Sequence, residues 1–154
     1  MNLITTKRTQ SSDENFCSLV FQLDMDLNKR YNNAQSEYDK YNKIDLIETV
    51  IVAYSDNKAI GCGCFKQFDE RIVEIKRMFV HPEYRGKGIS KIILSQLEDW
   101  AIELGFTKSV LETGKGQPEA IGLYTRIGYS LIDNFGQYTD MPNSVCFEKK
   151  LISN

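Results

Sequence analysis

Residues 72–90 read IVEIKRMFVHPEYRGKGIS, an apolar run that passes into a loop rich in glycine and charge. The β-branched and apolar residues up to position 80 predict a strand. Apolar residues then recur at helical spacing from 89 to 104, which predicts a long amphipathic helix that Gly105 stops. Glycine lets the chain turn tightly, and the first amides of a helix attract anions. The stretch therefore predicts a phosphate-binding loop, with a plain strand-to-helix turn as the alternative.

The segments before this stretch have the pattern of strands, and those after it alternate between strand and helix patterns. Upstream, residues 49–54, 59–68 and 72–80 are separated by short turn clusters, which predicts an antiparallel meander because such turns cannot hold a crossover. Downstream we expect a strand at 109–112, a helix from Pro118 to 127, and strands at 129–132 and 145–151. This order predicts a mixed α/β (α+β) sheet with helices packed on it.

The N-terminal part has a weaker pattern. Residues 3–8 are expected to form a first strand, and Asp13 is expected to cap a helix over residues 16–27. The polar segment 32–43 is expected to form a second short helix or a mobile flap.

Length and charge restrict the class of protein. A chain of 154 residues predicts one domain over residues 1–154. The net charge of −2 lacks the basic excess of a nucleic-acid-binding protein. No apolar stretch approaches the ~18 residues of a membrane span, and the N-terminus lacks the apolar segment of a secretory signal. We therefore expect neither a nucleic-acid nor a membrane partner.

The four cysteines are Cys17, Cys62, Cys64 and Cys146. With the single histidine, His81, they do not make the ligand spacing of a zinc site, so we expect no metal. We interpret all four as buried free thiols, which places the chain in the reducing cytoplasm.

Two common phosphate motifs do not fit the loop. A P-loop would place Ser or Thr after Gly-Lys, but Gly88 follows Gly86-Lys87. A dinucleotide-binding fingerprint would place a glycine three positions after Gly88, where Lys91 stands.

The loop resembles the signature of the GNAT superfamily of acyl-CoA-dependent N-acetyltransferases. That signature is Arg or Gln, two residues, Gly, one residue, then Gly or Ala; residues 85–90 match it except that Ser90 takes the last place, where some crowding is expected. Residues 111–129 resemble the family's next strand and helix, including Leu123-Tyr124 and Gly128-Tyr129. The resemblance covers about residues 48–151. It implies a GNAT-like mixed, mostly antiparallel sheet with flanking helices and a splayed central parallel strand pair.

The resemblance also implies how acetyl-CoA is held. Its pyrophosphate is expected on the loop, largely through backbone amides, with Arg85 adding mobile positive charge. The pantetheine arm is expected to pair with the end of the preceding strand, like an added strand. The expected contacts are Met78, Phe79, Val80, Arg85, Gly86, Lys87, Gly88, Ile89, Ser90 and Lys91, and more weakly Gln117.

Amide formation from an ammonium and a thioester needs a base for the amine and an acid for the leaving thiolate. The resemblance implies Tyr124 as the acid, although its spacing also fits a core tyrosine. It implies Glu74 as the base, although Glu74 also fits a cross-strand ion pair. Glu112 is the alternative base, and His81, in a loop before proline, is not expected to be catalytic.

We therefore predict transfer of an acetyl group from acetyl-CoA to a primary amine by direct attack in a ternary complex. The alternatives are another acyl-CoA donor, or a non-catalytic acyl-CoA-binding sensor of the same fold. The sequence does not identify the acceptor beyond a small-molecule or peptide amine. Five acidic residues flank the expected site: Asp45, Glu48, Asp69, Glu70 and Asp140. They either favour a cationic amine as acceptor or are charged loop residues in contact with solvent. A homodimer through the C-terminal strands stays open.

Overall fold

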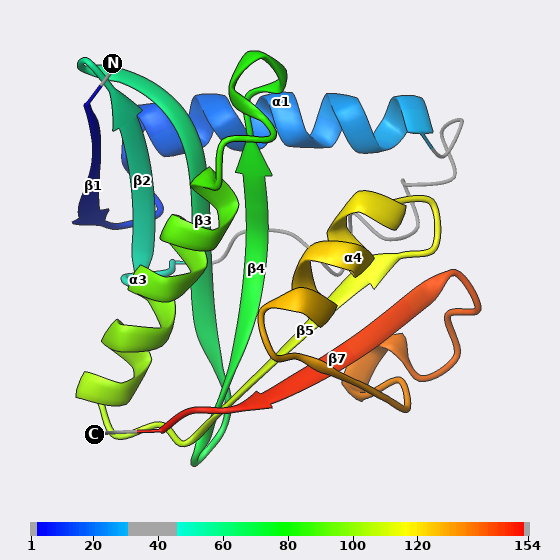
Figure 1. Cartoon of the computed structure of the whole chain (residues 1–154). Coiled ribbons are helices and arrows are strands. Elements are labelled where there is room, and N and C mark those ends of the chain that lie inside the picture. Colours follow the sequence, from blue (N-terminus) through cyan, green and yellow to red (C-terminus); the bar gives the residue numbers. More distant parts are fainter. Residues whose placement is uncertain (1–2, 31–45, 153–154) are drawn as a thin grey trace.

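Seven strands form one mixed sheet in the computed structural model, which describes residues 3–30 and 46–152 (Figure 1). Their spatial order is β1-β2-β3-β4-β5-β7-β6. The strands are β1 (Ile4–Thr9), β2 (Val50–Ser55), β3 (Lys58–Asp69), β4 (Ile72–Val80), β5 (Lys108–Gly114), β6 (Ser130–Ile132) and β7 (Ser144–Lys150). The described helices are α1 (Glu14–Arg30), α3 (Ile89–Glu103) and α4 (Pro118–Arg126), with 3-10 turns at Pro82–Tyr84 and Gly136–Tyr138. The segment 32–43, expected to be a helix or a flap, lies outside the described residues.

One neighbouring pair in the described sheet, β4 and β5, is parallel, and the other pairs are antiparallel. These two strands pair only from Ile72 to Ile75 and from Lys108 to Leu111. Beyond that point β4 continues along β3 and β5 continues along β7, so the two strands diverge (Figure 1). The predicted mixed, mostly antiparallel sheet with a splayed central parallel pair is therefore confirmed.

A β-bulge in β4 lies just beyond the paired segment. Cys64 of β3 pairs with Lys76, but Cys62 pairs with Phe79, so β4 has one extra residue across this step. Within it, Arg77 has a φ of 59°, in the left-handed region that residues other than glycine seldom adopt. A bulge bends its strand and increases the local twist, which gives β4 a course different from that of β5.

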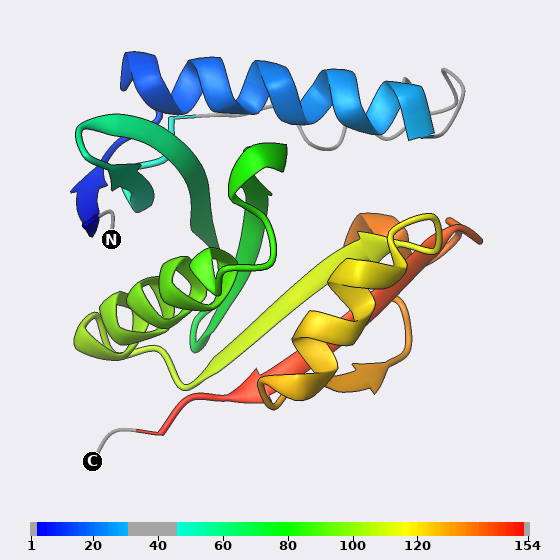
Figure 2. The same ribbon diagram turned by 45° about the horizontal axis from the view of Figure 1, so that its top comes forward.

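The two faces of the sheet carry different helices, with α1 on one side and α3 and α4 on the other (Figure 2). On the first face, a core joins α1 to the middle strands and includes Phe16, Leu19, Leu23, Val50, Val52, Cys64 and Phe79. On the second face, a larger core includes Ile51, Val73, Ile75, Ile93, Leu97, Leu111, Tyr124 and Phe147. The sheet is therefore buried on both sides in its central strands.

The helix ends lie where the sequence predicts them. The Phe16 N–H donates a 3.0 Å hydrogen bond to Asp13 Oδ1, so Asp13 caps α1. Gly105 and Gly128 follow α3 and α4 with φ of 93° and 100°, values that allow a helix to stop. None of the described helices combines the length and the apolar character needed to cross a membrane.

The prediction of four buried thiols is wrong for Cys17, which is exposed because its neighbour Phe16 takes the inward position on α1. Cys62, Cys64 and Cys146 are buried and free. Burial raises the pKa of Cys64 to about 12 and that of Cys146 to about 11, so both thiols stay protonated at neutral pH.

Gly63 lies in β3 opposite the bulge, and the space around it predicts a stability effect. A Cβ there would fall on Met78 Sδ and within 3.1 Å of Ile93 and Leu97. We expect Gly63→Ala to lower the free energy of unfolding by about 1–3 kcal/mol in urea titrations, because the bulge and α3 must move apart.

The matched control for this substitution is Gly122→Ala in α4. Its new Cβ would meet only the flexible end of Arg126, at 3.2 Å, so the change should raise stability by up to ~1 kcal/mol through helix propensity. A Gly63→Ala protein as stable as the wild type would contradict this account of the bulge.

Candidate active site

Two cavities occupy the space where β4 and β5 diverge. The loop cavity, about 450 Å³, lies over the loop between β4 and α3. The inner cavity, about 120 Å³, lies between the diverging strands, α1 and α4. Five residues from two helices, α1 and α4 with its N-cap, and one strand, β4, line both cavities: Leu23, Met78, Gln117, Ala120 and Tyr124. A molecule bound in either cavity therefore reaches the other at these side chains.

The residues expected to hold the acyl donor come together around the loop cavity. Its lining includes Met78, Phe79, Val80, Arg85, Gly86, Gly88, Ile89, Ser90, Lys91 and Gln117. Lys87 is the exception because it does not line this cavity. Its Nζ lies 5.4 Å from the centre of the Tyr84 ring. The fold thus gathers β4, the loop, α3 and the start of α4 around one space.

Two glycines with positive φ give the loop its shape, Gly86 at 78° and Gly88 at 79°. Gly88 is the N-cap of α3 and supplies no side-chain cap, and the first turn of α3 contains no acidic residue. The amides at this helix end are therefore not capped by a side chain of the helix itself, and with the positive end of the dipole they fit a pyrophosphate.

The side chain of Arg85 is held against the end of β4. Its Nε donates a 2.9 Å hydrogen bond to the Val80 carbonyl, and its guanidinium lies 5.6 Å from the centre of the Phe79 ring. Its Nη2 is 3.9 Å from the carboxylate of Asp26 on α1. The positive charge of Arg85 is therefore anchored beside the strand end, whereas the sequence had suggested a mobile charge.

Tyr124 stands where the two cavities meet. It lies on the inward face of α4, only 6% exposed, with ring centres 5.9 Å from Tyr129 and 6.2 Å from Phe147. Burial, together with the nearby Glu112 carboxylate, raises the pKa of Tyr124 well above that of free tyrosine. Tyr124 is therefore a core tyrosine that also lines a cleft and keeps its proton at neutral pH.

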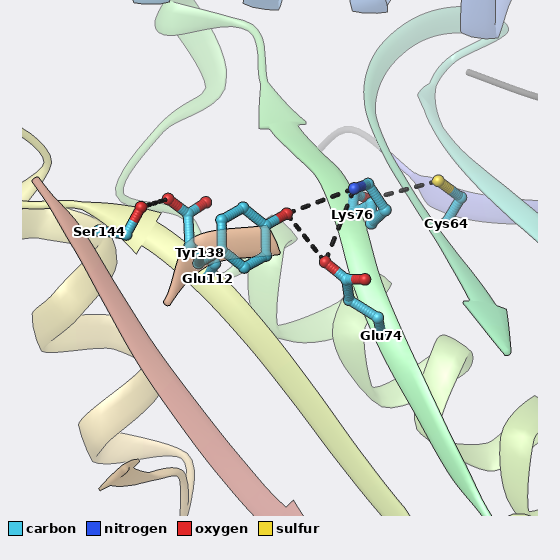
Figure 3. A network of polar contacts seen from close by, with 6 residues as sticks. All are labelled: Cys64, Glu74, Lys76, Glu112, Tyr138 and Ser144. Atoms are coloured by element: carbon cyan, nitrogen blue, oxygen red, sulfur yellow. Dashed lines mark hydrogen bonds and ion pairs between the residues drawn. The ribbon is translucent and has the colours of Figure 1, made fainter. Parts of the chain in front are cut away.

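Glu74, the carboxylate predicted as base, lies within a buried polar cluster with Lys76 and Tyr138 (Figure 3). Its Oε2 accepts a 2.9 Å hydrogen bond from the Tyr138 hydroxyl and lies 3.6 Å from Lys76 Nζ. Lys76 Nζ in turn donates to the Tyr138 hydroxyl at 3.3 Å. Tyr138 and Lys76 line the inner cavity, but Glu74 does not. An ion pair between Glu74 and Lys76 is therefore present, but it lies within β4 and does not cross strands as the sequence suggested.

Glu112, the alternative base, lines the inner cavity together with Tyr124. Its Oε2 accepts a 2.6 Å hydrogen bond from the Ser144 hydroxyl, as Figure 3 shows. Burial raises the pKa of Glu112, and the Ser144 hydrogen bond partly opposes this shift. A carboxylate with a raised pKa in a cleft suits proton acceptance near neutral pH.

Sequence reasoning did not identify two residues of the inner cavity, Tyr138 and Arg77. Tyr138 bonds to a residue 64 positions away in the chain, and no local pattern marks such a pair. The feature that marks Arg77 is its positive φ within the bulge, which only the backbone structure shows.

The arrangement matches a known protein family. The sequence profile of the acetyltransferase (GNAT) family matches residues 19–129. The chain belongs to this family. It is 32% identical over 152 residues to the IAA acetyltransferase of Azospirillum brasilense, which covers 96% of this chain and 98% of that protein. It is 34% identical over 101 residues to the N-acetyltransferase YsnE of Bacillus subtilis, covering 64% and 67% of the two chains.

Solved structures agree with this GNAT assignment. A Klebsiella pneumoniae chain assigned to the acyl-CoA N-acyltransferases has a TM-score of 0.77 at 30% identity, with 99% of each chain covered. A GNAT acetyltransferase of Elizabethkingia anophelis, solved with acetyl-CoA bound, has the same fold, with a TM-score of 0.71 at 19% identity over 96% of this chain and 98% of that one. This GNAT protein is therefore an acyl-CoA-dependent acyltransferase.

The loop at the start of α3 generates a binding prediction. Gly88→Asp places a negative charge at the helix end where the pyrophosphate is expected, so acetyl-CoA affinity measured by calorimetry should fall at least about tenfold, about 1.4 kcal/mol.

Gly88→Asn is the matched control, because asparagine has the shape of aspartate and both tolerate positive φ. It should lose much less affinity than Gly88→Asp. Equal losses in the two variants would assign the effect to backbone strain, and unchanged affinity in both would place the pyrophosphate elsewhere.

Proposed function

We propose that this protein transfers the acetyl group of acetyl-CoA to a primary amine by direct attack in a ternary complex. One observation carries the proposal: two cavities with different linings meet at Tyr124. The loop cavity, with its uncapped helix end, suits a long anionic donor. The inner cavity, which presents a carboxylate, suits a small acceptor, so both substrates fit at once.

Each proposed role follows from where the side chains lie. An alkylammonium with a pKa near ~10.4 must lose a proton before it attacks, and we assign that proton to Glu112. The amine nitrogen then bonds to the thioester carbon and gives its second proton to solvent, and collapse of the tetrahedral intermediate breaks the carbon–sulfur bond. Tyr124, which keeps its proton at neutral pH, donates it to the departing CoA sulfur.

Glu74 could act as the base only if Tyr138 or Lys76 relayed the proton to it. Its carboxylate is buried, and its contact with the inner cavity passes through Tyr138 and Lys76. A base needs hydrogen-bond reach to the proton it removes, directly or through one water, and Glu112 satisfies this more simply. We therefore propose Glu112 as the base and Glu74 as a residue that positions Lys76 and Tyr138.

A thiol-release assay with acetyl-CoA and a panel of amines tests the proposed function. Intersecting initial-velocity lines are expected for a ternary complex, whereas parallel lines would indicate an acyl-enzyme. Binding of acetyl-CoA without release of thiol for any amine would favour the sensor alternative. Faster release from a longer acyl-CoA would favour another donor.

Tyr124→Phe removes one oxygen and keeps the ring in the core. We expect kcat to fall by ~10²–10⁴-fold while acetyl-CoA affinity changes little. An acyl donor with a more acidic thiol should recover part of the loss, since its thiolate leaves without a proton.

Tyr54→Phe is the control for the loss of one tyrosine hydroxyl. The Tyr54 hydroxyl accepts a hydrogen bond from Asn15 at an exposed position away from both cavities, so its removal should leave kcat unchanged. Wild-type kcat in a folded Tyr124→Phe protein would exclude Tyr124 as the acid.

Glu112→Gln and Glu74→Gln separate the two carboxylates by pH dependence. Because the base must be ionised, wild-type kcat/KM should rise with pH through the raised pKa of Glu112. Glu112→Gln should lower kcat/KM by ~10²-fold near neutral pH, and this loss should shrink toward pH ~10, where the amine deprotonates unaided.

Glu74→Gln should instead lower stability by roughly 1–3 kcal/mol, because the buried Lys76 loses its carboxylate partner. Its effect on rate should not depend on pH. If the pH-dependent loss is found in Glu74→Gln and not in Glu112→Gln, the base is Glu74.

A further inference from the structure

The guanidinium of Arg77 has an unusual environment for a positive charge. Its side chain is only 8% exposed, and Arg77 lines the inner cavity. Nη1 donates a 2.7 Å hydrogen bond to Asp24 Oδ1 on α1. The buried Nε–H has no hydrogen-bond partner among the described residues. One edge of the guanidinium is therefore held by Asp24, and the Nε–H, which is buried in the protein, is unsatisfied.

An unsatisfied buried donor has an energetic cost that a ligand can remove. Leaving such a group without an acceptor costs about 1–3 kcal/mol, and more for a charged group. The guanidinium has donors in a fixed fork that matches the two oxygens of a carboxylate. With Nη1 engaged by Asp24, the Nε edge is the one left for a carboxylate, which reaches it once the guanidinium turns toward the cavity.

The remaining charges of the inner cavity are consistent with an acceptor of mixed charge. Lys76 is balanced by Glu74 within the buried cluster. The carboxylate of Glu112 lies on β5, the strand that diverges from the strand of Arg77, beside Tyr124. The cavity thus presents a cation on one strand and an acid on the other. Its volume of about 120 Å³ is roughly that of four water molecules, so the part of an acceptor that it encloses is small.

We propose that the acceptor is a small molecule with both an amine and a carboxylate, as in an amino acid, and that Arg77 binds the carboxylate. This inference rests on the proposed function. The amine lies toward Glu112 and Tyr124, where the thioester arrives, and the carboxylate satisfies the Nε edge of Arg77. Asp24 then has a positioning role, since it fixes the plane of the guanidinium. Amines without a carboxylate leave the Arg77 donor unpaired and are poor acceptors.

Thiol release with matched acceptors tests the inference. The panel contains the common amino acids, the corresponding carboxamides, and the corresponding amines that lack the carboxyl group. For the best amino acid, we expect kcat/KM to exceed that of its carboxamide by at least about tenfold, the cost of a lost charged hydrogen bond. Equal kcat/KM for acid, carboxamide and plain amine would overturn the inference and leave the proposed transfer reaction intact.

Arg77→Asn is the decisive variant, because asparagine tolerates the positive φ of this bulge position. It should raise KM for the amino acid at least about tenfold, remove the preference over the carboxamide, and leave KM for acetyl-CoA and kcat little changed. Asp24→Asn is the control: it removes the charge that pairs with Arg77 but keeps the guanidinium. If Arg77 only connects α1 to β4, both variants will lower kcat/KM for the amino acid and for its carboxamide to the same extent. That result would overturn the inference.

Calorimetry on the CoA-saturated protein keeps the inference testable without turnover. Binding of an amino acid that is lost in Arg77→Asn would support the carboxylate site even if no amine in the panel releases thiol, a result that would reject the proposed function alone. No binding of any amino acid at millimolar concentration, with amine transfer present, would reject the inference alone. The circular dichroism melting curve of Arg77→Asn shows whether the variant is folded, and Arg77→Lys, which keeps charge without the fork, should retain only part of the preference.

Discussion

The divergence of β4 and β5 after four paired residues is the constraint on which the site depends. Neighbouring strands normally stay paired, because backbone amides and carbonyls that lose partners away from water are costly. Here each strand keeps its other neighbour, β3 for β4 and β7 for β5, so the sheet holds together around a gap. Both strand edges that face this gap line the inner cavity, and the β4 edge also lines the loop cavity. In the proposed complex, the amides of the pantetheine arm supply the partners that one edge lacks.

Helices from opposite faces complete the cleft that the strands open. From one face, α1 places Leu23 in both cavities and is tied to the cleft by ion pairs from Asp24 to Arg77 and from Asp26 to Arg85. From the other face, α4 places Tyr124 at the junction. The two cavities thus share a boundary made by side chains, and in the proposed reaction the proton donor lies at this boundary.

Burial assigns different tasks to the two carboxylates. Oε2 of Glu74 is compensated by Lys76 and Tyr138, which offsets part of the cost of burying the charge. The buried Oε1 has no hydrogen-bond partner among the described residues. Glu112 has a single hydroxyl donor, Ser144, and lines the cavity, so burial raises its pKa. Two acids that are close in the fold therefore differ in environment, one locked in a structural cluster and one exposed to the reacting space. Such separation of environments is what distinguishes an acid–base group from a structural one.

The sequence by itself determined the element order, most helix ends and the glycine-rich turn before α3, because these depend on local periodicity and on single residues such as Asp13, Gly88 and Gly105. It also located Tyr124 and the lining of the loop cavity, since the relevant residues lie in two short motifs. The tertiary structure alone decided which carboxylate meets the cavity. Glu74 lies within the paired segment of β4 and β5, whereas Glu112 lies just beyond it, where the strands diverge. Arg77 likewise became visible only through the bulge and α1, because its backbone strain and its unsatisfied donor arise from contacts between segments far apart in the chain.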